Sequence, residues 1–338
     1  MLTHLLRCAA LALCLAAPAL ARDVTDSAGR VVPVPDTVSR VVAAGVPASV
    51  ILYALAPEKL ANWARAPSDR DLVLPETHDL PVTGRLTERG GEANLEAVLA
   101  LTPDLIVDYG TISPRFAEGA DAMQARTGIP VLLIDGDFDA IPDALRTLGA
   151  ALDVAERAEA LAADAEARLA ANDALVASVS ESERPSVWLA RGPDGRETGP
   201  QGSISTEIIE RAGARNAAGP GDGTATLITA SAEQLLLADP QMAVTLDRDF
   251  AANYADDPVW ADTVAGKAGR VWLAPSAPFG WIDSPPSVNR LIGLSWMAAL
   301  LWPDRAGTDL RADARDFYAL WYQVTPTDAQ LDALLGGE

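Results

Sequence analysis

The sequence has very little cysteine or histidine. Both cysteines, Cys8 and Cys14, lie close to the N-terminus, so the rest of the chain has no disulfide, thiolate metal site or cysteine nucleophile. Beyond the N-terminal His4, the single histidine is His78. A bare zinc or manganese site draws on several histidines, so we expect no metal held directly by this chain. His78 lies in a polar segment and is expected to be a solvated loop residue.

Long apolar runs are also missing. The run over residues 8–17 falls well short of the roughly 20 apolar residues that a spanning helix needs. It is followed by Ala-Leu-Ala at residues 19–21, a small-x-small cleavage site. These features predict a cleavable signal peptide over residues 1–21 and export to the periplasm. Leu13, not a small residue, precedes Cys14, so we expect no lipidation.

Positive charge is in short supply: 26 Lys and Arg face 47 Asp and Glu, which gives a net charge of −21. A net negative charge of this size repels nucleic acid and keeps an exported protein soluble. The composition, 49% hydrophobic with 25 Gly and 24 Pro, is typical of a packed α/β protein. With 338 residues the chain exceeds what one core usually serves, so we expect two lobes in a monomer.

Short apolar runs bounded by Gly and Pro predict strands at residues 40–45, 104–108 and 130–134. Helical patterns lie between them at residues 48–56 and 94–101, the second with Asn94 as its N-cap. Alternating strands and helices predict a largely parallel sheet.

An internal repeat relates the two halves of the chain. Residues 96–107 and 233–244 each run from a glutamate through a helical stretch to a proline and then an apolar strand. A further strand follows in each half, at residues 131–134 and 271–274. We therefore expect two similar α/β lobes.

The segment between the halves is rich in Ala, Leu and charged residues, with no glycine after Gly149 until the second half begins. This composition predicts a long or once-broken helix, on the order of 50 Å in length, that bridges the lobes. The expected organisation is a signal peptide (1–21), an N-terminal lobe (22–140), a bridging helix (141–180) and a C-terminal lobe (181–338).

Several motifs, in this order, resemble the solute-binding proteins of ABC importers for iron complexes, siderophores, haem and cobalamin. They comprise residues 40–45 with 51–55, 81–85, 94–107, 199–203 with 208–216, and 279–294. The resemblance implies a helical-backbone periplasmic binding protein fold, in which two Rossmann-like lobes are joined by a long rigid helix. It also implies a transport role without a cofactor, an ABC permease as partner, and a small metal complex or oxyanion as ligand. A ferric siderophore is the first candidate, followed by molybdate or tungstate, haem and cobalamin.

The ligand of an open parallel sheet lies beyond the C-terminal ends of its strands. Ser49 and Ser203 occupy expected helix N-termini there, where backbone amides favour an anion. Arg85 and Arg191 provide bidentate contacts to carboxylate, phosphate or oxyanion oxygens. The alternatives are plain helix caps for the serines and surface salt bridges for the arginines.

Two aromatic residues are further candidate ligand contacts. Tyr109 has a phenolate that suits Fe(III) or haem, and Trp281 has a ring that suits a flat chelate. Trp281 also lies in a loop rich in Gly and Pro, where function is common. The alternative for both residues is a place in the core.

The resemblance also implies that one acidic side chain on each lobe pairs with arginines of the permease. Glu118 is the candidate on the first lobe and Asp249 on the second, where Asp247, Asp256 and Asp257 are nearby alternatives. Solvated surface charge is the competing interpretation for each of them.

An exported hydrolase is the rival from another class. The sequence contains no Gly-x-Ser-x-Gly elbow, no His-Glu-x-x-His and no Walker A loop. A glycosidase that uses two carboxylates stays open, because paired acids have no fixed spacing. A structural envelope protein is a third class, which predicts no ligand and no permease. We expect a transport protein without catalytic residues.

Overall fold

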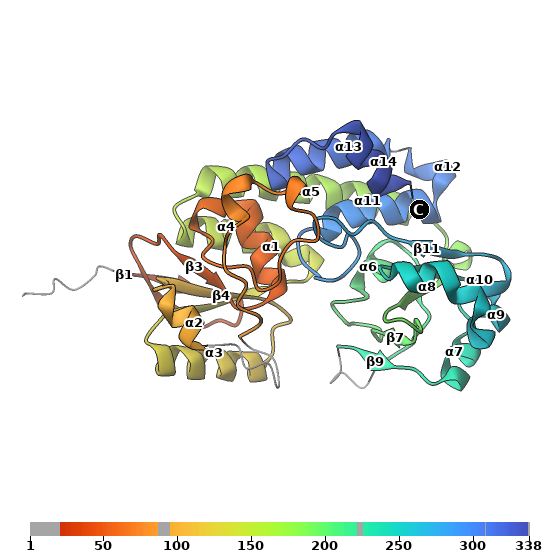
Figure 1. The fold of residues 1–338 in the computed structure, drawn as a ribbon, viewed down its shortest axis with the longest axis horizontal. Coiled ribbons are helices and arrows are strands. Elements are labelled where there is room, and N and C mark those ends of the chain that lie inside the picture. Colours follow the sequence, from red (N-terminus) through yellow and green to blue (C-terminus); the bar gives the residue numbers. More distant parts are fainter. Residues whose placement is uncertain (1–20, 87–94, 222–225, 308, 337–338) are drawn as a thin grey trace, which may run out of the picture.

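The computed structural model describes residues 21–86, 95–221, 226–307 and 309–336. Over these residues the chain forms two α/β lobes connected by helices along one side (Figure 1). The expected signal peptide, except for Ala21, and the expected N-cap Asn94 lie outside the described residues. None of the helices in the described ranges combines the length and the apolar character needed to cross a bilayer.

The N-terminal lobe is built on a parallel three-stranded sheet in the order β3-β4-β5. Successive strand residues alternate between two hydrophobic clusters, with Val41 in one and Val42 in the other, so the sheet is buried on both faces. Its elements are the hairpin β1 (Ala21–Thr25) and β2 (Val31–Pro35), then β3 (Val41–Ala43), α1 (Val46–Leu55), α2 (Leu95–Ala100), β4 (Leu105–Gly110), α3 (Pro114–Thr127), β5 (Val131–Asp135) and α4 (Ile141–Ala151).

The C-terminal lobe contains a parallel four-stranded sheet in the order β11-β10-β6-β8, and a short antiparallel pair, β7 with β9. Its elements are β6 (Ser186–Ala190), β7 (Glu197–Thr198), α6 (Glu207–Arg211), β8 (Arg215–Asn216), β9 (Ile228–Thr229), α7 (Ala232–Ala238), β10 (Met242–Thr245), α8 (Arg248–Asn253), α9 (Pro258–Asp262), α10 (Val264–Lys267) and β11 (Val271–Leu273). The chain ends with α11 (Arg290–Leu301), α12 (Pro303–Ala306), α13 (Leu310–Phe317), a π-helical turn (Tyr318–Tyr322) and α14 (Asp328–Leu335).

The predicted internal repeat is confirmed. In each lobe a helix ends before a proline and leads into the central strand: α2 and Pro103 into β4, α7 and Pro240 into β10. The third strands, β5 and β11, each pair with that central strand, as the first strands β3 and β6 do. Gly128 and Gly269, which precede the third strands, have φ values of 72° and 65°, a left-handed conformation that glycine adopts without a steric penalty.

The connector is broken once and is not a single strut over residues 141–180. Helix α4 ends at Ala151, and α5 (Ala155–Ala177) starts after Asp153, whose φ of 56° interrupts the helix. The two helices pack so closely that a Cβ added to Gly149 would lie 2.2 Å from the Cβ of Ala158. Only α5 therefore runs on toward the second lobe, for about 35 Å at ~1.5 Å per residue.

One hydrophobic core continues through both lobes. The same cluster contains Val41 of β3, Leu161 of α5, Leu189 of β6 and Trp321 of the C-terminal π-helical turn. Figure 1 shows α5, α11 and α13 together along the side that joins the lobes. A shared core of this kind favours small hinge displacements over a large rotation of one lobe.

Candidate ligand-binding cleft

A cavity of about 290 Å³ lies between the lobes, at the C-terminal ends of their parallel strands. The N-terminal lobe contributes Gly45 and Pro47 after β3 and residues 108–112 at the end of β4. The C-terminal lobe contributes Arg191 after β6 and residues 283–286 from the loop before α11. This is the position at which open parallel sheets bind their ligands.

Three arginines line this cavity: Arg65, Arg85 and Arg191. Burial lowers the pKa of Arg65 from its usual value, and the guanidinium groups of Arg85 and Arg191 lower it further. The pKa of Arg85 is lowered for the same two reasons, by burial first and then by Arg191. The three positive charges therefore lie close enough to repel one another, and an anion between them relieves that repulsion.

Arg65 was not predicted from the sequence. It follows the buried Trp63, whose Nε1 donates to the Thr77 carbonyl oxygen at 2.9 Å and fixes the start of this loop. The Arg65 guanidinium then reaches across the cavity and donates to the Ser284 carbonyl oxygen at 2.7 Å. An arginine two positions after a loop tryptophan was the available signal, but it does not indicate which way the arginine points.

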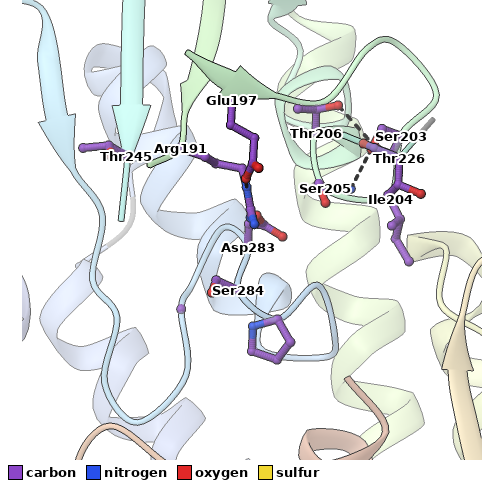
Figure 2. Close-up of polar contacts among 12 residues, drawn as sticks. Arg191, Glu197, Ser203, Ile204, Ser205, Thr206, Thr226, Thr245, Asp283 and Ser284 are labelled. Carbon is purple, nitrogen blue, oxygen red and sulfur yellow. Dashed lines mark hydrogen bonds and ion pairs between the residues drawn. The ribbon is translucent and has the colours of Figure 1, made fainter. Parts of the chain in front are cut away.

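Arg191 is held in place by two carboxylates (Figure 2). Its Nε donates to Glu197 Oε1 at 2.8 Å, and its Nη1 donates to Asp283 Oδ2. Such a pair of ionic hydrogen bonds presets the orientation of the guanidinium before any ligand arrives.

Asp283 and Asp108 place acidic groups among the arginines. Asp283 is fully buried, and its second oxygen, Oδ1, has no hydrogen-bond partner among the described residues. Asp283 lies in the sequence motif at residues 279–294, but Trp281 was the residue of that motif predicted to contact the ligand. No pattern in that stretch distinguishes a cleft residue from a loop anchor.

Tyr109 lies at the end of β4 and lines the cavity, as predicted. Its side chain is only 3% exposed, and its hydroxyl has no hydrogen-bond partner in the described part of the chain. Burial raises the pKa of this phenol above its usual value. Loss of the phenolic proton is therefore less favourable here than for an exposed tyrosine.

Trp281 does not line the cavity. Its ring is fully buried, and Nε1 donates to the Tyr318 hydroxyl at 3.0 Å. A Cβ added to Gly293 of α11 would lie 1.9 Å from the Trp281 carbonyl oxygen, so the backbone is tightly packed as well. The prediction of a ligand contact through this ring is wrong, because the large aromatic side chain anchors the Gly- and Pro-rich loop to the core.

The hydroxyl groups of Ser49 and Ser203 also form hydrogen bonds with the backbone of the protein. Ser49 lies inside α1, where its hydroxyl donates to the Gly45 carbonyl oxygen at 3.3 Å and accepts from the Ala64 amide at 3.0 Å. The Ser203 hydroxyl donates to the Thr226 carbonyl oxygen at 2.5 Å. Neither begins a helix, since α1 starts at Val46 and α6 at Glu207. The N-terminus of α1 still faces the cavity, through Gly45 and Pro47.

His78 lies away from the cavity, and its Nε2 is 3.3 Å from the Val73 carbonyl oxygen. Among residues 21–86, 95–221, 226–307 and 309–336, no group of three or more His, Cys, Asp or Glu side chains is arranged to hold a metal ion.

Glu118 and Asp249 lie at equivalent places in the two lobes. Glu118 is exposed in α3, the helix after β4, and Asp249 is exposed in α8, the helix after β10. Helix α3 starts after β4, whose end lines the cavity, and α8 starts after β10, the central strand of the other lobe.

Comparison with known proteins identifies the family. A family model described as periplasmic binding protein matches residues 51–278. No curated protein sequence matches the chain. An ABC transporter solute-binding protein from Sulfurospirillum deleyianum has a similar structure, with a TM-score of 0.82 and 28% identity over 93% of this chain and 99% of that one.

Two further solved structures have the same fold and descriptions that name a ligand. A molybdate-binding protein of Haemophilus influenzae gives a TM-score of 0.74 at 23% identity, covering 90% of this chain and 99% of that one. A periplasmic haem-binding protein of Pseudomonas aeruginosa gives 0.59 at 26% identity, covering 79% and 94%. The chain therefore belongs to the periplasmic binding protein family and has the fold of the solute-binding proteins of ABC transporters.

Proposed function

We propose that this protein captures an anionic, metal-containing complex in the cleft between its lobes and delivers it to an ABC permease. The observation that carries this proposal is the convergence of Arg65, Arg85 and Arg191 on one cavity in a protein with a net charge of −21. The arginines in the lining outnumber its two carboxylates, Asp108 and Asp283, and this balance in a strongly negative molecule favours an anionic ligand.

A ferric complex is our first candidate for that ligand. Carboxylate, hydroxamate and catecholate groups around iron present the oxygens that guanidinium groups bind in bidentate fashion. The cavity has about 290 Å³, at the lower end of the usual range for small-molecule sites, and this favours a compact complex over haem or cobalamin.

Molybdate or tungstate is the second candidate. Its support is the similarity in fold to a protein described with bound molybdate, and the same three arginines suit a tetrahedral oxyanion. In either case we propose that the metal arrives within its complex, because the described residues contain no group of three or more His, Cys, Asp or Glu side chains arranged to hold a metal ion.

The cellular location is inferred from the family and from the N-terminal sequence. We propose that residues 1–21 are a signal peptide, removed on export to the periplasm. Glu118 and Asp249 are our candidates for the contacts with permease arginines, one on each lobe. Their equivalent positions on α3 and α8 support a docking surface that senses both lobes at once.

The test is a thermal-shift screen of residues 22–338 with ferric siderophores of the three chelate classes, ferric citrate, molybdate, tungstate, haem and cobalamin. A ligand that binds only the folded state raises the unfolding midpoint. We expect a rise with an anionic ferric complex, smaller in each of Arg65→Ala, Arg85→Ala and Arg191→Ala.

Arg126→Ala is the matched control, because it removes one positive charge from an exposed position in the last turn of α3. It should leave the ligand-induced rise unchanged. A rise with molybdate or tungstate alone would keep the binding role and replace the ligand. No rise with any compound, or an equal rise in the three cleft variants, would contradict the proposal.

A further inference from the structure

Only one of the two carboxylate oxygens of Asp283, in the cleft, has a hydrogen-bond partner among the described residues. Asp283 is 0% exposed and lines the cavity between the lobes. Its Oδ2 accepts a hydrogen bond from Arg191 Nη1, whereas its Oδ1 is buried without a donor among the described residues. In Figure 2 a carboxylate oxygen of Asp283 projects away from the Arg191 guanidinium. Buried polar atoms are nearly always paired, so this oxygen lacks a partner that a ligand can supply.

Asp283 cannot easily turn away from this position. On one side of it, Trp281 is locked into the core by its hydrogen bond to Tyr318. On the other side, Asn289 Nδ2 donates to the Pro285 carbonyl oxygen at 2.9 Å, and Arg65 holds the Ser284 carbonyl oxygen at 2.7 Å. The loop therefore holds Asp283 in the lining of the cavity.

A carboxylate oxygen accepts hydrogen bonds and cannot donate one. A ligand oxygen without a proton that approached Oδ1 would meet repulsion with no hydrogen bond in return. A ligand N–H or O–H would instead form an ionic hydrogen bond with an oxygen that is buried from water. The arginines require negative charge on the ligand, and Asp283 requires a donor beside that charge.

We propose that Asp283 makes the cleft selective for anionic ligands that also present an N–H or O–H group. An amide N–H of a ferric chelate, water bound to its iron, or the proton of a hydrogen oxyanion would all meet this requirement. Fully deprotonated oxyanions such as molybdate and sulfate would not. This inference rests on the proposed function and sharpens it, since it ranks the ferric complexes above bare molybdate.

The test compares probes of matched shape by calorimetric titration at neutral pH. Hydrogen phosphate and hydrogen arsenate each keep an O–H, while sulfate and molybdate have none. The pairs are hydrogen phosphate with sulfate and hydrogen arsenate with molybdate. The wild-type protein should bind the anion with the O–H at least about tenfold more tightly in each pair, because a site built to accept a hydrogen bond rejects an analogue that has no donor. The ferric complexes of the thermal-shift screen are titrated in the same way.

Asp283→Asn is the diagnostic variant, because its amide has nearly the same shape and offers a donor to the ligand. It should weaken the donor-bearing probes and donor-bearing ferric complexes by about tenfold and leave sulfate and molybdate unchanged or tighter. Glu197→Gln is the control, since it removes the other carboxylate partner of Arg191 and leaves the Asp283 oxygen in place. It should shift all probes alike.

The outcomes separate this inference from the proposed function. A preference of the wild-type protein for sulfate or molybdate, or an equal change of all probes in Asp283→Asn, overturns the selectivity and leaves the binding role intact. The same pattern in Glu197→Gln as in Asp283→Asn also overturns it, because the effect would then act through the charge of Arg191. No binding of any probe or ferric complex overturns both proposals.

Discussion

The guanidinium of Arg290 donates a hydrogen bond of 2.7 Å to the carbonyl oxygen of Gly136, which joins the C-terminal helices to the N-terminal lobe. Arg290 also pairs with Glu207 of the C-terminal lobe at 2.9 Å and lies 4.3 Å from the centre of the Phe138 ring. The other oxygen of Glu207 accepts from the Phe138 amide at 3.0 Å. A single ion pair, with a fully buried arginine and a partly exposed glutamate, therefore makes contacts to both lobes.

The variant Arg290→Met is expected to destabilise the protein by about 3–5 kcal/mol, because it leaves the Glu207 carboxylate without its buried partner. The measurement is the free energy of unfolding in denaturant. Arg305→Met is the control, since Arg305 pairs with Glu183 at the surface, where ion pairs contribute little to stability. Equal effects of the two substitutions would contradict this assignment.

Stability should fall steeply in alkaline solution. Burial raises the pKa values of Tyr53, Tyr109, Tyr318 and Tyr322. Above about pH 10 the unfolded chain loses these phenolic protons while the folded protein keeps them, so the free energy of unfolding decreases as the pH rises. Each tyrosine contributes a slope of about −1.4 kcal/mol per pH unit in that range.

Tyr322→Phe tests this directly, because its hydroxyl is buried and has no hydrogen-bond partner in the described part of the chain. The substitution should leave stability at neutral pH unchanged or slightly higher, and should remove about 1.4 kcal/mol per pH unit from the alkaline slope. Denaturant titrations between about pH 8 and about pH 11 measure both quantities. An unchanged slope would show that the phenol does not titrate differently in the two states.

Trp281 should matter for stability and not for ligand contact. Trp281→Phe loses the hydrogen bond from Nε1 to Tyr318 and leaves a void, for an expected loss of about 2 kcal/mol in the free energy of unfolding. The dissociation constant of the ligand should change by less than about threefold, since the ring does not line the cavity. A large loss of affinity at full stability would return Trp281 to the binding site.

Glu118 and Asp249 should act in delivery. The double charge reversal Glu118→Arg with Asp249→Arg places like charges against the permease arginines and should reduce uptake at least about tenfold. Ligand affinity should stay the same, because both side chains are exposed on α3 and α8 outside the cavity. The assay is uptake of labelled ligand by cells that express the protein with its permease.

Glu156→Arg with Glu181→Arg is the matched control for uptake, since both are exposed acidic residues on other elements. This pair makes the same change in net charge. If it reduces uptake as much as the first pair, the effect comes from the overall charge and the docking assignment is wrong.

The two lobes could be predicted from the sequence because their repeat depends on local sequence signals. Prolines end helices α2 and α7, Ser231 caps α7, and apolar runs of strand length follow. Each of these signals acts over a few residues and determines backbone conformation locally. The break at Asp153 gave a weaker signal, because a residue with positive φ in an Ala-rich helical stretch is set by the packing of α4 against α5.

Only some of the cleft residues could be predicted from the sequence. Tyr109 lies at the end of β4 and Arg191 directly follows β6, and the topology brings such residues together. Arg85 lies in the loop before α2 and was named from the motif at residues 81–85. Arg65 and Asp283 come from long loops whose direction depends on distant anchors, Trp63 on Thr77 and Trp281 on Tyr318. The aromatic residue is the conspicuous one in the sequence, while the charged residue two positions later is the one that reaches the cavity.

The most direct test of the central claim is equilibrium dialysis of residues 22–338 against a mixture of ferric complexes, molybdate and tungstate, with the retained metal identified by elemental mass spectrometry. The wild-type protein should retain one metal species at a ratio near one per chain. The triple variant Arg65→Met, Arg85→Met, Arg191→Met, confirmed as folded by its unfolding transition, should retain none. Retention of the same metal at the same ratio by the triple variant would contradict the account, because the ligand would then bind without the three arginines.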